Sequence, residues 1–247
     1  MPARDTPRLR GSPTVHEGPW PVGCLPDDAI LRLAERLAHR KALGFKDLGG
    51  DDASTMIAAA FEGEHLGSPV GLADMVADGG TAWSVKTVKQ ELPINTRLVR
   101  LVSGRNSLDY SFGVSDPRKD IQATGRYVLS IWNSRVNAAL DEFNELRVVV
   151  LIRNFTAGDY VIFEQPIQQY VYDDYDWSVN KQSNFEGRDK RSGWHWFTWQ
   201  PSGGQFTIRR PVPGSARRFR FTRPIPYHSQ EFVLRAIGYD NTWVDIG

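Results

Sequence analysis

The chain has 247 residues, of which 40% are apolar and 24% are charged, and its net charge is +1. This composition is that of a globular protein, and it excludes a disordered chain and a histone-like binder that depends on bulk positive charge. The single cysteine, Cys24, excludes a disulfide framework or a cysteine-based zinc site within the chain. No apolar run is long enough for a membrane span and the N-terminus lacks the apolar part of a secretory signal, so a cytoplasmic protein without membrane contact is expected.

The chain begins with a segment rich in Pro, Arg and Gly, which predicts a flexible N-terminal arm over residues 1–26. We expect one domain over residues 27–247. Start signals at Asp27, directly after a proline, predict a first helix that ends near Gly44.

A second helix and a β-hairpin are predicted next. Capping residues after a Gly-Gly break predict a helix over residues 53–65, with Glu64 on its apolar face. Residues 72–76 predict a short strand, and the Asp- and Gly-rich residues 77–80 predict a turn. The β-branched residues of 81–88 predict the returning strand.

A long helical pattern occupies residues 116–146. It is followed at residues 147–153 by an apolar run typical of a strand buried on both faces, which residues 160–163 are expected to pair with. Residues 173–205 are polar, aromatic and rich in glycine, with little periodicity. Further short strands are predicted at 205–210, 217–222 and 232–237. This order predicts an α/β protein with a central mixed β-sheet flanked by helices.

The predicted hairpin carries the residues with the clearest chemistry. Period-two alternation places Ser84 and Lys86 on one face of the returning strand, and the short turn brings Asp74 alongside them. A carboxylate and an amine in one small volume suit phosphodiester hydrolysis. The carboxylate holds Mg²⁺, which polarises the phosphate and activates water, and the lysine orients that water or offsets developing charge.

Asp74 followed by Ser84-Val85-Lys86, after a segment containing Glu62 and Glu64, resembles the PD-(D/E)XK nuclease superfamily and, within it, the type II restriction endonucleases. The resemblance covers about residues 53–90 and extends loosely to the apolar strand and the Asn- and Gln-rich loops after it. It implies a Mg²⁺-dependent enzyme that cuts double-stranded DNA at a short palindromic site, with Asp74 and Lys86 catalytic and a homodimer as the active form.

The sequence departs from the family pattern at two positions. Ala73 stands where the motif has proline, and Ser84 stands where it has the second acidic residue. Because serine is a poor Mg²⁺ ligand, the missing carboxylate is expected from elsewhere. Glu64 is the first choice for this metal ligand, and Glu62 and Glu91 remain open.

A second informative stretch combines cations, aromatic residues and a Ser-Gly-Gly turn between residues 181 and 205. Arginine reads guanine and Asn or Gln reads adenine in the major groove, and short glycine turns allow close backbone approach to a phosphate. The alternative interpretation is an aromatic core corner with solvated charges. The residues expected to contact DNA are Lys181, Asn184, Arg188, Lys190, Arg191, Gln200, Ser202 and Gln205.

Three other functions stand beside the restriction endonuclease. One is a nuclease of the same fold that acts in repair or on modified DNA. Another is a DNA-binding protein with this fold but weak or no activity, which Ser84 favours. The third is a protein-interaction module that uses the Trp- and Tyr-rich surface.

Overall fold

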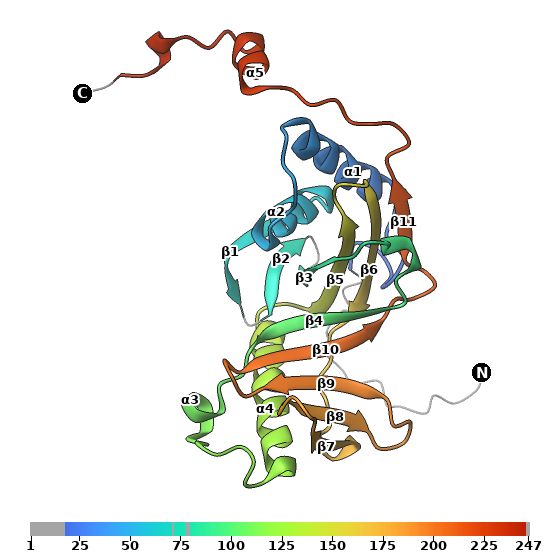
Figure 1. Ribbon diagram of the computed structural model, residues 1–247, viewed down its shortest axis with the longest axis vertical. Helices are drawn as coiled ribbons and strands as arrows, with labels where there is room; N and C mark the ends of the chain where they lie inside the picture. Colours follow the sequence, from blue (N-terminus) through green and yellow to red (C-terminus); the bar gives the residue numbers. More distant parts are fainter. Residues whose placement is uncertain (1–17, 71, 78–79, 246–247) are drawn as a thin grey trace, which may run out of the picture.

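The computed structural model describes residues 18–70, 72–77 and 80–245. In this part of the chain the strands form two sheets flanked by helices, which confirms the predicted α/β architecture (Figure 1). None of the helices in the described ranges is long and apolar enough to cross a membrane.

Sheet A is the mixed sheet that carries the predicted hairpin. In spatial order its strands are β1 (Glu64–Val70), β2 (Ala73–Ala77), β3 (Thr81–Lys89), β5 (Glu145–Asn154), β6 (Asp159–Pro166) and β11 (Arg217–Arg220). Neighbouring strands are antiparallel except β3 and β5, which are parallel. Parallel neighbours need a long crossover, and the chain between β3 and β5 includes the helix α4 (Ile121–Leu140).

Helices cover the two faces of sheet A. On one face, α1 (Asp27–Ala42) and α2 (Gly50–Ala60) pack their buried residues against Trp83 and Val149. On the other face, α4 packs Val128 and Trp132 against Val148 and its neighbours on β5. The apolar run of β5 is therefore buried on both faces, as its sequence predicted.

Sheet B is antiparallel and lies across the end of sheet A (Figure 1). Its strands, in spatial order, are β4 (Leu98–Arg105), β10 (Gln205–Pro211), β9 (His195–Gln200), β8 (Phe185–Asp189) and β7 (Tyr175–Val179). The inner face packs Trp177, Phe197 and Phe206 into the core with α4. Gly125 permits the closest approach of helix and sheet, since a Cβ there would lie 2.3 Å from ring atoms of Trp177.

The predicted second helix is too long at its C-terminal end. It ends at Ala60, and Glu62 then adopts a left-handed backbone with φ of 56°. Gly63 follows, where a Cβ would lie 2.5 Å from the carbonyl oxygen of Val76. This tight reversal turns the chain into β1, so Glu64 begins a strand and does not lie on the helix face that was expected.

Two further differences concern the C-terminal half. The segment 173–205 forms the strands β7, β8 and β9, where a register shift between Gly187 and Arg188 interrupts the alternation. The predicted strand at 232–237 is the helix α5 (Gln230–Ala236), whose N-terminus is capped by the Ser229 hydroxyl. Figure 1 shows α5 standing away from both sheets. The short elements are η2 (Pro93–Asn95), α3 (Leu108–Phe112), η3 (Tyr172–Asp174) and η4 (Asn241–Trp243).

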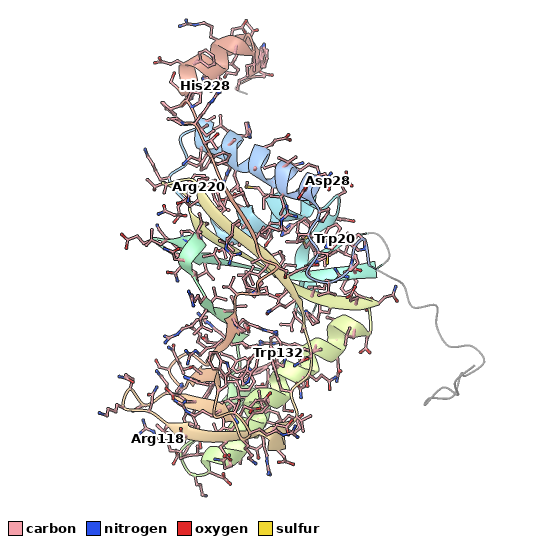
Figure 2. The ribbon with its side chains drawn as sticks, turned by 90° about the vertical axis from the view of Figure 1, so that its right-hand side faces the viewer. Trp20, Asp28, Arg118, Trp132, Arg220 and His228 are labelled. Atoms are coloured by element: carbon pink, nitrogen blue, oxygen red, sulfur yellow. The ribbon has the colours of Figure 1, made fainter. Side chains whose placement is uncertain are left out.

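Part of the predicted N-terminal arm contacts sheet A. Residues 1–17 lie outside the described residues. The ring of Trp20 packs edge-on against Phe61, with 5.0 Å between centroids, and its Nε1 donates to Glu164 at 2.9 Å. Figure 2 shows Trp20 beside the strands of sheet A. The same buried carboxylate accepts hydrogen bonds from Trp83 and Arg147.

Candidate functional site

The β2–β3 hairpin brings together the three residues that the sequence singled out. Met75 pairs with Trp83, so Asp74 lies directly opposite Ser84. Asp74 Oδ2 accepts hydrogen bonds from the Val85 backbone N–H at 2.7 Å and the Ser84 hydroxyl at 3.3 Å. Lys86 Nζ lies 3.4 Å from the same oxygen and donates to the Val85 carbonyl at 3.1 Å.

This cluster lies between the core and the solvent. The side chains of Asp74 and Lys86 are 23% and 25% exposed, whereas Ser84 is buried. A half-buried position allows a ligand to reach the carboxylate and the ammonium group. It also leaves fewer waters to screen their charges than at an open surface, which strengthens their interaction with a charged ligand.

A small cavity lies behind Ser84 and Lys86, between sheet A and the inner face of sheet B. Its volume is about 10 Å³, which is about the smallest that can hold one water. Most of its lining is apolar, with polar groups from Ser84, Lys86, Ser103 and Arg210. The full lining is Leu72, Ser84, Lys86, Leu101, Ser103, Trp132, Val148, Ile167, Ile208 and Arg210.

Of the three candidate acids, Glu64 is placed best to join Asp74. Glu64 pairs with Val76, so it shares a face with Val76 and with Asp74, two residues away on β2. Diagonal neighbours of this kind are separated by about 7–8 Å between backbones, which long side chains can bridge. The Glu64 side chain is exposed. The structure thus places Glu64 on the same face of the sheet as Asp74, through a strand and not through the helix that was predicted.

The other two acids are directed elsewhere. Glu62 forms an ion pair with Arg32 of α1 at 3.4 Å and is 74% exposed. Glu91 follows the end of β3, and its backbone carbonyl accepts from Asn154 at 2.9 Å. No three His, Cys, Asp or Glu side chains gather into a potential metal site within the described ranges.

The donor set on the hairpin nevertheless suits one kind of metal ion. Mg²⁺ usually keeps several waters and is held by one or two carboxylates together with substrate phosphates. Asp74 supplies one such carboxylate and Glu64 can supply a second. The Ser84 hydroxyl is engaged as a hydrogen-bond donor to Asp74. The residues fit Mg²⁺ with substrate as a co-ligand, and they do not form an all-protein cage.

The predicted DNA-contacting residues divide between the two ends of sheet B. Lys181 and Asn184 lie in the β7–β8 turn, and Gln200, Ser202 and Gln205 lie in or beside the β9–β10 turn at the same end. Register pairing places Gln200 opposite Gln205.

The opposite end of sheet B is the more basic one. Arg188 ends β8, and Lys190 and Arg191 follow in the β8–β9 connection. Arg188 is partly neutralised by Glu186 at 2.9 Å, and Lys190 lies 3.8 Å from Asp176.

Two arginines that the sequence analysis did not assign to DNA contact belong to this basic end. Arg209 on β10 pairs directly with Arg100 on β4. No ion pair joins either of them to a carboxylate in the part of the chain that the structure describes. Like charges directly opposite each other on a sheet are destabilising, so this pair favours an anionic partner. The short apolar run around Arg100, Leu-Val-Arg-Leu-Val at residues 98–102, is the signal that could have identified this strand.

The local electrostatics are consistent with a cationic surface. Burial, followed by the charges of Arg100 and Arg188, lowers the pKa of Arg209. Burial also lowers the pKa of His195, whose ring Nε2 lies 2.8 Å from the Phe197 carbonyl. His195 is therefore neutral at pH 7, and the positive charge at this end comes from the arginine and lysine side chains.

A scan against protein-family models, a search of curated proteins and a search of solved structures each found no match to this chain.

Proposed function

We propose that the protein is a Mg²⁺-dependent endonuclease that hydrolyses phosphodiester bonds of double-stranded DNA, of the type II restriction endonuclease kind. The observation that carries the proposal is the contact of Asp74 with both Ser84 and Lys86 across the β2–β3 hairpin. One carboxylate oxygen of Asp74 thus meets a hydroxyl and an amine at a position that is about one quarter exposed, where a ligand can reach them.

Each residue has a separate role in the proposed reaction. Asp74 and Glu64 would hold Mg²⁺, which supplies polarisation of the phosphate and a lowered pKa for a bound water. Lys86 orients the attacking water and offsets the negative charge that develops on the phosphoryl oxygens. The Ser84 hydroxyl donates a hydrogen bond to Asp74 and thereby holds the carboxylate in position.

Sheet B supplies the DNA-binding surface in this proposal. Cations at one end, including Arg100 and Arg209, would contact phosphates, and the Gln200–Gln205 pair at the other end offers hydrogen bonds to base edges. A palindromic site would be read by a homodimer, because each subunit then reads one half-site and cuts one strand.

A DNA-binding protein without cleavage activity is the second candidate. The observation in its favour is that Ser84 replaces the second motif acid, and that the described residues contain no cluster of three potential metal ligands. Binding would then depend on sheet B alone.

Plasmid digestion in the presence of Mg²⁺ or of EDTA tests the proposal. We expect discrete Mg²⁺-dependent fragments from the wild type and none from Lys86→Ala, with DNA binding retained in a gel-shift assay. Lys89→Ala is the matched control, because Lys89 lies on the same strand, is 72% exposed and forms an ion pair with Asp47.

The possible results separate the candidates. A gel shift without cutting supports the DNA-binding protein, and smearing of the plasmid supports a non-specific nuclease. Undiminished cutting by Lys86→Ala rules out the role of this lysine.

A further inference from the structure

Arg210 is a buried arginine on the inner face of sheet B. It lies on β10 with its side chain toward the interior, and the residue is only 8% exposed. Its Nη2 donates to the Tyr170 hydroxyl at 3.2 Å. Among the residues that the structure describes, no carboxylate forms an ion pair with it.

An uncompensated cation in the interior is costly, so its presence calls for an explanation. Tyr170 does not supply a negative charge, because burial raises the pKa of its hydroxyl and keeps it protonated. The other charged group that lines the same cavity is Lys86, which is a cation already paired with Asp74. Arg210, Lys86 and Asp74 together therefore carry a net charge of +1 at this cavity.

We propose that Arg210 is an anion-binding residue that receives one non-bridging oxygen of a phosphate through the cavity beside Ser84 and Lys86. This inference rests on the proposed nuclease function for the identity of the phosphate, a phosphodiester of the DNA backbone.

The size of the cavity determines which part of the ligand enters. A volume of about 10 Å³ accommodates one water-sized atom, so one oxygen enters while the phosphorus and its other substituents stay outside. Lys86 lines the cavity and its side chain is one quarter exposed, so this lysine can be reached from the solvent. The apolar walls strengthen a charge-assisted hydrogen bond from Arg210, because they lower the local dielectric.

Inorganic phosphate is the probe for this site, and thermal unfolding at constant ionic strength is the readout. A ligand that binds only the folded state stabilises it by RT ln(1 + [L]/Kd), so the melting temperature rises with the ligand concentration. We expect this rise in the wild type, and in Arg210→Met the phosphate concentration that gives the same rise should be at least about 10-fold higher. Methionine keeps the unbranched apolar stem and removes the charge.

Arg126→Met is the control, since Arg126 lies on α4, is 63% exposed and forms an ion pair with Asp173 at 3.2 Å, away from the cavity lining. It should respond to phosphate as the wild type does. An unchanged phosphate response in Arg210→Met overturns the inference.

A second measurement covers the case in which Arg210→Met does not fold. The Nε–H resonance of Arg210 in the wild type, assigned by its absence in Arg210→Lys, should shift on titration with phosphate. A resonance that stays in place at saturating phosphate overturns the inference as well.

These experiments contain neither DNA nor metal, so they fail independently of the proposed function. A phosphate response that depends on Arg210, in a protein that does not cut the plasmid, supports the anion site and rejects the nuclease. Cleavage by the wild type, together with phosphate binding that ignores Arg210, rejects the anion site alone.

Discussion

Replacing Glu164 with glutamine is expected to destabilise the protein strongly, because this buried carboxylate joins three separate parts of the chain. Its side chain is 0% exposed, and Oε1 accepts from Trp20 Nε1 at 2.9 Å, Gly23 N at 3.0 Å and Arg147 Nη1 at 3.0 Å. Oε2 accepts from Trp83 Nε1 at 2.8 Å. Whichever oxygen the glutamine NH2 group replaces, that NH2 donor then faces the N–H donors that the oxygen had accepted from.

The size of the loss follows from the partner that remains. Arg147 is 2% exposed, and within the described residues the carboxylate partner that it keeps is the partly exposed Glu145 at 2.7 Å. Removing one member of a buried ion pair costs about 3–5 kcal/mol. With a denaturant slope of about 1–3 kcal/mol per M of urea, the unfolding midpoint should fall by at least about 1 M.

Urea unfolding followed by tryptophan fluorescence measures this effect, with Asp173→Asn as the control. Asp173 pairs with Arg126 at 3.2 Å, and both side chains are mostly exposed, so its loss should cost less than about 1 kcal/mol. If Glu164→Gln unfolds within about 1 kcal/mol of the wild type at an unchanged slope, the reasoning about this network is wrong.

Two other substitutions test the packing and the titration of the core. Gly125→Ala should lower the melting temperature, because a Cβ at this position would lie 2.3 Å from the Trp177 ring. Overpacking of this kind costs about 1–3 kcal/mol, whereas the higher helix propensity of alanine contributes roughly 1 kcal/mol. A higher melting temperature would contradict this prediction. Burial raises the pKa of Tyr175 from 10.0 to about 12, so its contribution to stability is complete below pH 10 and is lost as the pH rises toward 12. Between these two pH values the unfolding midpoint of Tyr175→Phe should therefore fall less steeply than that of the wild type. If both midpoints fall in parallel, Tyr175 is not the group responsible.

The elements that the sequence predicted well are those whose pattern is set by local burial. The run of apolar residues in β5 has to be covered on both faces, and α1 and α4 provide apolar surfaces at helical spacing. The hairpin was predictable because its turn is short and glycine-rich, which fixes the strand register. For the same reason the contact of Asp74 with Ser84 and Lys86, residues no more than 12 positions apart, could be inferred before the structure.

The elements that were missed depend on features with no local signature. The turn between α2 and β1 contains Glu62 with a positive φ. Such a conformation is uncommon for residues other than glycine, so the sequence did not indicate it. The bulge near Arg188 breaks the alternation that would have marked β8 and β9 as strands. In α5 none of the residues is buried, so its apolar side chains did not indicate which face, if any, packs inward.

The pair Arg209 and Arg210 shows most clearly why the complete site was beyond sequence reasoning. Both belong to one basic stretch, and alternation along a strand requires one side chain to face each side of the sheet. The sequence does not determine which of them faces inward, because that choice depends on how sheet B packs against sheet A. Leu101 and Ile208 are buried on the inner face of sheet B, and the register of β10 places Arg210 on the cavity that Lys86 also lines, and Arg209 opposite Arg100. A shift of β10 by one residue would exchange the two arginines, so the anion site depends on contacts between residues more than 100 positions apart.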